Sequence, residues 1–325
     1  MTRVIVVGSF NLDHAWTAGS LPHPGETIGG RYASGPGGKG FNQAVAAARA
    51  GAGTTFMCAL GDDDAGAAAR AMAKADGIEL RVARSESPTG TAGIFVAADG
   101  ANSIVVAPGA NADLSPEFVE DHAGAIAAAG VLLAQLEVPV PAVRAAMRLA
   151  RGAGVPTVLN PAPADAATTP DLLALCDILV PNETEFAALV QRHLGEVIAA
   201  QAVAGLDDAT LHALCRQLLP AGHVVVTLGA AGCFASHPDT APDHAGGGGP
   251  IAFQRLAAQG VAVRDTTGAG DAFCGALAAS LALDRRAAFG HHMRFANRYA
   301  ALSSERPGAA VAMPRRGELV ARFGD

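Results

Sequence analysis

Short apolar runs alternate with stretches of helical periodicity along most of the chain. Val4–Val7 is a continuous β-branched run ending at Gly8, as is typical of a buried parallel strand. Similar runs predict further strands at 54–60, 131–135, 155–159, 177–180 and 223–228. Helical spacing predicts helices at 40–50, 115–128, 139–152, 207–219 and 272–283. The alternation predicts one Rossmann-like α/β domain over 1–325, with a mostly parallel central sheet and helices on both faces.

Two segments interrupt this pattern. Residues 14–34 are polar and rich in proline and glycine, more like exposed hairpin strands than helix. Within 90–107, apolar residues alternate around the turn at Asp99 and Gly100. We expect the two segments to form one small β-sheet subdomain.

Two further stretches read as surface insertions. Residues 191–208 show no clear pattern. Ser236–Pro250 contains four consecutive glycines and is of low complexity, which predicts a mobile loop.

Composition and charge exclude several classes of protein. Of the 325 residues, 50% are hydrophobic, and the formal net charge is −7 without any Lys/Arg cluster longer than two residues. Nucleic-acid binding is therefore not expected. No apolar run reaches the length of about 18 residues that a membrane span needs, and no signal-peptide core follows Met1. The five cysteines are odd in number and lack CxxC spacing, which predicts buried free thiols and a cytoplasmic protein.

The segment Asp265–Asp271 carries the clearest chemistry. Its glycines stand at the start of a predicted helix, where backbone N–H groups can converge on an anion. Such a nest suits the charge on a transferring phosphoryl group, and Asp271 beside it could take a proton from an attacking hydroxyl. The alternative is a glycine-rich loop with an ordinary capping aspartate.

A second glycine cluster, Gly35–Gly40, formally matches GxGxxG. A dinucleotide fingerprint would follow the first strand directly, whereas more than twenty residues intervene here. Close backbone approach to a hydroxyl-rich ligand fits better, with Lys39 and Asn42 as polar contacts. The alternative is a helix N-terminus with a solvated lysine.

Polar residues also follow several predicted strands, at the crevice where open α/β sheets bind ligands. Asn11, Asp13 and Glu137 could hold sugar hydroxyls there, or Asn11 and Asp13 could form a simple Asx turn. Asn182 and Glu185 could cap a helix or lie near a magnesium–phosphate site. The segment 227–229 reads equally as a strand end or a nucleotide contact.

These segments, in this order, resemble the ribokinase-like (PfkB-type) sugar kinases over nearly the whole chain. The shared motifs are Gly8-Ser9 with Asn11–His14, Pro24–Thr27, Gly37–Gly40 with Asn42–Ala44, Gly61–Asp63, Asn160–Ala164, Pro181–Glu185, Thr227–Gly229 and Asp265–Asp271.

The resemblance assigns roles by position. It implies that Asp271 is the catalytic base and that Gly268, Ala269 and Gly270 form the anion hole. The sugar contacts that it implies are Asn11, Asp13, Gly38, Lys39, Asn42, Glu137 and Asp271. The nucleotide contacts that it implies are Asn182, Thr227, Gly229, Gly270 and Asn297. Glu185 takes the position linked to Mg²⁺, through water.

The resemblance also implies a monovalent-cation site, normally for K⁺, at Asp265, Thr267, Ser303, Arg306 and Gly308. Two positions depart from the family pattern. Ala312 replaces a serine usual near that site. Phe41 replaces a small residue and, if it faced the pocket, would reshape the sugar site.

The expected activity is ATP·Mg²⁺-dependent phosphorylation of the primary hydroxyl of a pentose such as D-ribose, giving ribose 5-phosphate. The resemblance also implies that the subdomain of 14–34 and 90–107 is a β-sheet lid on the main domain, and that two chains form a homodimer through their lids. A fructokinase, a deoxyribose kinase or a nucleoside kinase of the same family are alternatives. An NAD-dependent oxidoreductase, which rests only on the displaced GxGxxG, and a non-catalytic sugar-binding relative are rivals of other classes.

Overall fold

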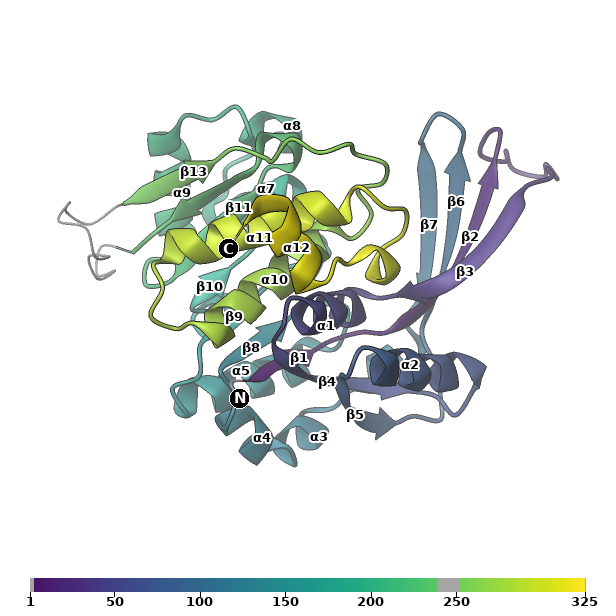
Figure 1. Ribbon diagram of the computed structural model, residues 1–325, viewed down its shortest axis with the longest axis horizontal. Coiled ribbons are helices and arrows are strands. Elements are labelled where there is room, and N and C mark those ends of the chain that lie inside the picture. The colour runs from purple at the N-terminus through teal and green to yellow at the C-terminus, as the bar shows by residue number, and fades with distance from the viewer. Residues whose placement is uncertain (1–2, 239–251, 325) are drawn as a thin grey trace.

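The computed structural model describes residues 3–238 and 252–324. They form a nine-stranded sheet flanked by helices and a separate four-stranded sheet that projects from it (Figure 1). The large sheet has the order β13-β12-β11-β10-β9-β8-β1-β4-β5. Its strands are β1 (Arg3–Val7), β4 (Gly53–Leu60), β5 (Glu79–Arg84), β8 (Val131–Ala134), β9 (Thr157–Leu159), β10 (Ile178–Leu179), β11 (His223–Thr227), β12 (Cys233–Ser236) and β13 (Phe253–Leu256).

Seven of these strands, from β5 to β11, run parallel, and β12 and β13 extend the edge in antiparallel fashion. Side chains of β1 alternate between the two faces: Val4 and Val6 enter one buried cluster, whereas Ile5 and Val7 enter the other. The buried β-branched runs thus form the centre of the sheet because both of their faces are covered. The predicted Rossmann-like α/β fold is confirmed.

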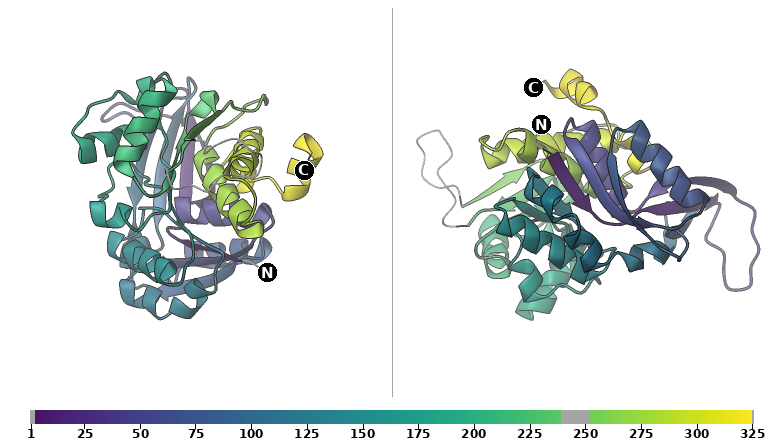
Figure 2. Two further views of the ribbon diagram at one scale, coloured as in Figure 1. Left: turned by 90° about the vertical axis from the view of Figure 1, so that its left-hand side faces the viewer. Right: turned by 90° about the horizontal axis from the view of Figure 1, so that it is seen from below.

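Helices cover both faces of the large sheet (Figure 2). One face carries α1 (Lys39–Arg49), α2 (Asp64–Ala75), α10 (Ala269–Leu283), α11 (Phe289–Ser303) and α12 (Arg316–Phe323). The other carries α3 (Pro116–Glu120), α4 (Ala123–Ala127), α5 (Val140–Gly152), α6 (Pro170–Leu173), α7 (Glu183–Leu194), α8 (Ala200–Val203) and α9 (Asp208–Leu218). Three short 3₁₀ turns are η1 (Gly109–Asp113), η2 (Gly229–Ala231) and η3 (Ala310–Ala312). No helix in these ranges is long and apolar enough to cross a membrane.

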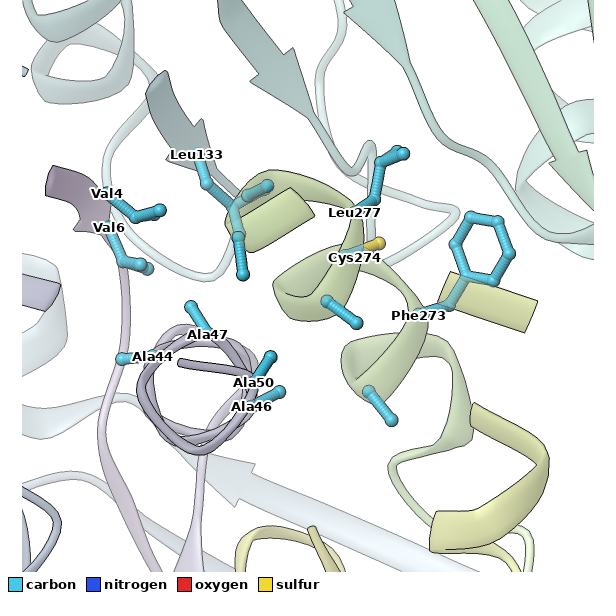
Figure 3. Packing of buried hydrophobic residues seen from close by; sticks show 14 of the residues in the cluster. Val4, Val6, Ala44, Ala46, Ala47, Ala50, Leu133, Phe273, Cys274 and Leu277 are labelled. Carbon is cyan, nitrogen blue, oxygen red and sulfur yellow. The ribbon is translucent and has the colours of Figure 1, made fainter. Parts of the chain in front are cut away.

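The first cluster is built largely of small side chains. Figure 3 shows Val4, Val6 and Leu133 of the sheet beside α1 and α10. Where those two helices meet, α1 presents alanines such as Ala46 and Ala47. The five cysteines are free and buried, as predicted.

The small sheet has the order β3-β2-β6-β7 and arises from the two irregular insertions. Its strands are β2 (Asn11–Ala18), β3 (Arg31–Gly37), β6 (Thr91–Ala97) and β7 (Asn102–Ala107). The sheet therefore starts at Asn11 and reaches Gly37, a few residues beyond the bounds predicted for the first insertion.

Two predictions about elements were wrong. The helix expected at 115–128 is split into α3 and α4. The imidazole Nδ1 of His122 lies 2.8 Å from the Phe118 carbonyl oxygen, and the His122 N–H donates instead to Val119. The side chain thus competes for the carbonyl that a continuous helix would use.

Residues 191–208 are also more regular than predicted. The helix α7 continues to Leu194 and ends at Gly195 in the left-handed conformation. The short helix α8 follows, anchored by the fully buried Val203. The loop predicted at Ser236–Pro250 lies mostly in 239–251, outside the described residues.

Candidate active site

The site lies at the carboxyl ends of the parallel strands, beside the start of α10. A cavity of about 140 Å³ opens there. It is lined by Lys39, Asn160, Val180, Asn182, Glu185, Thr227, Gly268, Gly270, Asp271 and Cys274. Residues from five separate parts of the sequence thus meet at one crevice, and most of them were singled out from the sequence.

The first turn of α10 presents free backbone donors. Gly268 precedes the helix with φ of 74°, a left-handed conformation that favours glycine. Ala269 N–H donates to Thr266, and Ala272 N–H donates to Gly268. Within the described residues no hydrogen bond is made by the N–H groups of Gly270 and Asp271, which lie between them. These orphan donors suit an anion.

Asp271 sits in this first turn, 7% exposed. Its Oδ2 accepts a hydrogen bond of 2.9 Å from Asn42 Nδ2, and its Oδ1 accepts one of 2.9 Å from Gln43 Nε2. Burial raises the pKa of the carboxyl, and Lys39 and the two amides only partly offset this. A carboxylate with a raised pKa is matched to proton abstraction near neutral pH.

Lys39 opens α1 and faces the same crevice. Burial alone would lower the pKa of its ammonium group, but the carboxylates of Asp271 and Glu137 outweigh burial, and the pKa is raised. Lys39 therefore stays charged, and it is the one cationic side chain among the described residues that line the cavity.

Glu137 and Asn11 are tied to neighbouring backbone and side chains. Glu137 Oε2 accepts from Ser9 Oγ at 2.6 Å and from the Lys39 backbone N–H at 2.9 Å. Asn11 Oδ1 accepts from Asn111 Nδ2 at 2.8 Å. These bonds fix both side chains where β1 passes into the small sheet.

Asp13 and Gly38 lie beside them. Burial, and then the charges of Glu137 and Asp271, raise the pKa of Asp13 to about 7. Gly38 has φ of 84°, and a Cβ there would lie 2.8 Å from the Asn11 backbone nitrogen. This close approach of α1 to β2 requires glycine.

Asn182 and Glu185 form a reciprocal capping box at the start of α7. Glu185 Oε2 accepts from the Asn182 backbone N–H at 2.9 Å, and the Glu185 N–H donates to Asn182 Oδ1 at 2.8 Å. Both residues nevertheless line the cavity. The capping alternative is therefore correct as local structure, and it holds both side chains at the crevice.

Of the remaining nucleotide candidates, one lines the cavity and two do not. Thr227 lines it, whereas Gly229 begins η2 just beyond. Asn297, on α11, donates through Nδ2 to the Ala257 carbonyl at 2.7 Å and does not line the cavity.

The cation candidates gather around the loop before α10. Asp265 Oδ1 accepts from the Thr267 N–H at 2.9 Å, and Oδ2 accepts from the Gly308 N–H at 2.8 Å. Burial opposes ionisation of Asp265, but these bonds hold its pKa below the ordinary value. Ser303 Oγ donates to Ala300, and Arg306 pairs with Glu318.

Phe41 does not face the pocket. It is 1% exposed and packs in the core against the rings of Phe10 and Phe56, with centroids 5.1 Å and 6.0 Å away. The condition under which Phe41 would reshape the sugar site is therefore not met, because its position on α1 turns it toward the sheet. Two polar residues went unassigned: Gln43 and Asn160, both buried at the site. Their signal was a glutamine on the apolar face of a helix and an asparagine directly after a buried strand.

Comparison with known proteins places this architecture in a family. Residues 1–316 match the model of the pfkB family of carbohydrate kinases. The chain is 36% identical to a ribokinase of Haemophilus influenzae, covering 97% of this chain and 96% of that protein. It is 37% identical to a bifunctional ribokinase/ribose-5-phosphate isomerase A of Fructilactobacillus sanfranciscensis over 98% of its length, and spans only 56% of that longer protein.

A solved structure of Arabidopsis thaliana ribokinase complexed with ribose and ATP is also similar, with a TM-score of 0.80 and 30% identity. The match covers 99% of this chain and 98% of that one. The chain belongs to the pfkB family of carbohydrate kinases.

Proposed function

We propose that this protein phosphorylates D-ribose with ATP, giving ribose 5-phosphate. In this proposal Asp271 removes the proton from the primary hydroxyl, and the oxygen attacks the γ-phosphorus as its bond to ADP breaks. Gly268, Ala269 and Gly270 would form the anion hole that stabilises the charge on the phosphoryl oxygens. The N–H of Ala269, which donates to Thr266, would have to exchange that bond for one to a phosphoryl oxygen. The observation that carries the proposal is the carboxylate of Asp271 beside unpaired N–H groups in the first turn of α10.

The sugar would bind between α10 and the small sheet, on Asn11, Asp13, Gly38, Lys39, Asn42 and Glu137. The side chain of Asn42 gives a specific reason to expect a sugar hydroxyl there. Its Oδ1 is buried and accepts no hydrogen bond within the described residues, while its Nδ2 is held by Asp271. A buried acceptor without a donor is costly, and a sugar hydroxyl would satisfy it.

The nucleotide would lie on Asn182, Thr227, Gly229, Gly270 and Asn297, with its phosphates toward α10. Mg²⁺ suits the oxygen-rich end of α7: Glu185 presents a carboxylate there and would hold the ion through water. When bound, Mg²⁺ neutralises charge on the β- and γ-phosphates.

We also propose a K⁺ site at Asp265, Thr267, Ser303, Arg306 and Gly308. The donor chemistry fits, since Asp265 is held ionised and ties the two loops together. Backbone carbonyls would supply most ligands. Ala312 is buried and offers no hydroxyl at the position where the family has a serine.

The small sheet would act as a lid and as the contact between two copies of the chain. Residues that pair across the strands share a face. One face carries Asp13, whose carboxylate interacts with Glu137 and Asp271, so that face looks toward the crevice. The opposite face carries the exposed rings of Trp16, Tyr32 and Phe95 in one row. An exposed aromatic row of this kind suits a protein partner.

A reducing compartment, the cytoplasm, fits the five unpaired thiols, because disulfides are rare there. The net charge of −7 likewise fits small-molecule substrates and not nucleic acid.

Release of ADP from ATP·Mg²⁺, measured with D-ribose, 2-deoxyribose, fructose and adenosine, tests this proposal. We expect ribose to give the highest kcat/KM. A preference for fructose, deoxyribose or adenosine would reassign the acceptor within the family, and no acceptor-dependent release would overturn kinase activity.

The Asp271→Asn substitution tests the base. It keeps the size of the side chain and removes the proton acceptor, so we expect kcat for ribose to fall by about 10²- to 10⁴-fold. Circular dichroism and ATP binding should be unchanged, and near-wild-type turnover would contradict the assignment.

A further inference from the structure

A chain of buried side-chain amides runs behind the catalytic carboxylate. Gln135 follows β8, Gln43 lies on α1, and Asn160 follows β9. Gln43 and Gln135 are fully buried, and neither lines the cavity. Three elements therefore contribute polar groups at a depth where an unmade hydrogen bond is costly. Among the described residues, Gln135 Oε1 is the one oxygen of this chain that accepts no hydrogen bond.

The chain of hydrogen bonds has a fixed direction. Gln135 Nε2 donates to Gln43 Oε1 at 2.5 Å, and Gln43 Nε2 donates to Asp271 Oδ1 at 2.9 Å and to Asn160 Oδ1 at 3.0 Å. Asn160 Nδ2 donates in turn to the Val180 carbonyl at 2.9 Å. A flipped Gln43 would set its carbonyl oxygen against two acceptors and its amino group against the donor of Gln135.

We infer that Gln43 is a positioning residue for the base, held in its donor orientation by Gln135. The acceptors Asp271 Oδ1 and Asn160 Oδ1 favour the same orientation, because a flipped Gln43 would place its carbonyl oxygen against both. The other oxygen of Asp271 accepts from Asn42, and the two bonds together fix the plane of the carboxylate relative to the crevice. Gln43 acts without touching the sugar. This inference rests on the proposed function of Asp271.

The inference has a consequence for pH. A hydrogen bond donated to a carboxylate stabilises its ionised form, so loss of the Gln43 donor should make Asp271 easier to protonate. The charged or titratable groups that face Asp271 come from several elements: Lys39, Glu137, Asp13, Glu185 and Cys274. None of them hydrogen-bonds to Gln43 in the described residues. A substitution of Gln43 therefore leaves their charges in place.

Gln43→Met is the direct test, because methionine keeps the length of the side chain and removes both the amino donor and the carbonyl acceptor of the amide. We expect kcat for ribose at pH 7 to fall by about 10- to 100-fold, as for loss of a hydrogen bond to a charged group. The acid limb of the kcat–pH profile should move upward by about one pH unit. The ribose KM should change little, because the Gln43 side chain is fully buried behind the carboxylate and has no surface to offer a sugar.

Gln135→Met tests the orientation separately. It leaves both bonds to Asp271 possible but removes the donor that holds Gln43, so the acid limb should move in the same direction by a smaller amount. If the Gln43→Met variant does not fold, the Gln135→Met variant is sufficient to test the inference. Ser280→Ala is the matched control. Ser280 lies on α10, the same helix as Asp271, and its substitution removes a buried hydrogen bond of 2.8 Å to His292 on α11. It should lower stability and leave the acid limb unmoved.

An acid limb in its wild-type position in Gln43→Met, or in Gln135→Met where only that variant folds, would overturn the inference, because a purely structural residue lowers kcat equally at every pH. These outcomes presuppose that the wild type releases ADP in response to a sugar. A wild type without such activity would overturn the proposed function instead.

Discussion

At the level of single residues, the main feature of the crevice is the number of acidic side chains close to one another. Asp13, Glu137 and Asp271 all face it, and Lys39 is the only cation that lines the cavity within the described residues. Each carboxylate loses water there and repels the others, so the folded protein without substrate carries an electrostatic cost. Such sites commonly exchange stability for function. Asp13 shows the effect most clearly, since its carboxylate accepts no side-chain or backbone hydrogen bond among the described residues.

Asp13→Asn should therefore stabilise the substrate-free protein at high pH. The pKa of Asp13 rises from 3.8 to about 7 on folding. The contribution of this group to the free energy of unfolding is therefore greatest below about pH 4, where the carboxyl is neutral in both the folded and the unfolded state. That contribution is lost as pH rises through 7 and the buried carboxyl ionises. We expect the variant to melt roughly 2–5 °C above the wild type at pH 8, with the difference shrinking toward pH 4. Thermal melts across this range measure it.

The same variant should bind ribose more weakly, because Asp13 is a proposed sugar contact. An increase in melting temperature that is equal at pH 4 and pH 8 would show that the charge of Asp13 is not the cause.

At the level of elements, the distance between α1 and α10 sets the geometry of the site. Asn42 and Gln43 on α1 reach Asp271 on α10 only because the helices pack closely over small side chains (Figure 3). The alanine-rich composition thus has a structural use at this interface. Gly275 permits this close packing: a Cβ there would lie 2.4 Å from the Gln43 carbonyl oxygen and 2.5 Å from the Ala46 Cβ.

Gly275→Ala should push α10 away from α1. We expect a loss of roughly 1–3 kcal/mol in the free energy of unfolding, measured with urea, since the backbone of α1 cannot yield cheaply. The kcat for ribose should fall as well, because the two hydrogen bonds to Asp271 lengthen. Gly124→Ala on α4 is the control: its Cβ would meet nothing within 4 Å, so it should be neutral or stabilising. Equal effects of the two substitutions would contradict this account of the interface.

The sequence predicted elements better than contacts. The β-branched runs such as Val4–Val7 identified the parallel strands, because a strand covered on both faces must be apolar throughout. The break between α3 and α4 was missed because it depends on one imidazole that competes for a backbone carbonyl. The roles of Gln43 and Asn160 were also missed. The hydrogen bonds from Gln43 to Asn160 and to Asp271 span 117 and 228 residues of sequence, and no local pattern records such pairs.

At the level of the whole molecule, the two faces of the small sheet have different surroundings. Asp13 belongs to the face that looks toward the crevice, and Ile104 and Val106 share that face by register. His14, Trp16, Tyr32, Phe95 and Val105 share the opposite face. The large exposed apolar residues of this outer face include Tyr32, 55% exposed, and Val105, 68% exposed. Because the sheet projects from the main body, a second copy could reach this face (Figure 2).

The dimer proposal therefore predicts a sharp dependence on the outer face. Wild-type protein should sediment at about twice its chain mass of 32.5 kDa. Val105→Glu would bury a charge without a partner in the contact, so we expect the dimer to dissociate at micromolar concentration. Val197→Glu is the matched control, since Val197 is 81% exposed and lies outside the small sheet. A monomeric wild type, or a Val105→Glu variant that stays dimeric, would show that the aromatic face serves some other contact. Loss of ribose affinity when the dimer dissociates would show that the lid needs its partner to close.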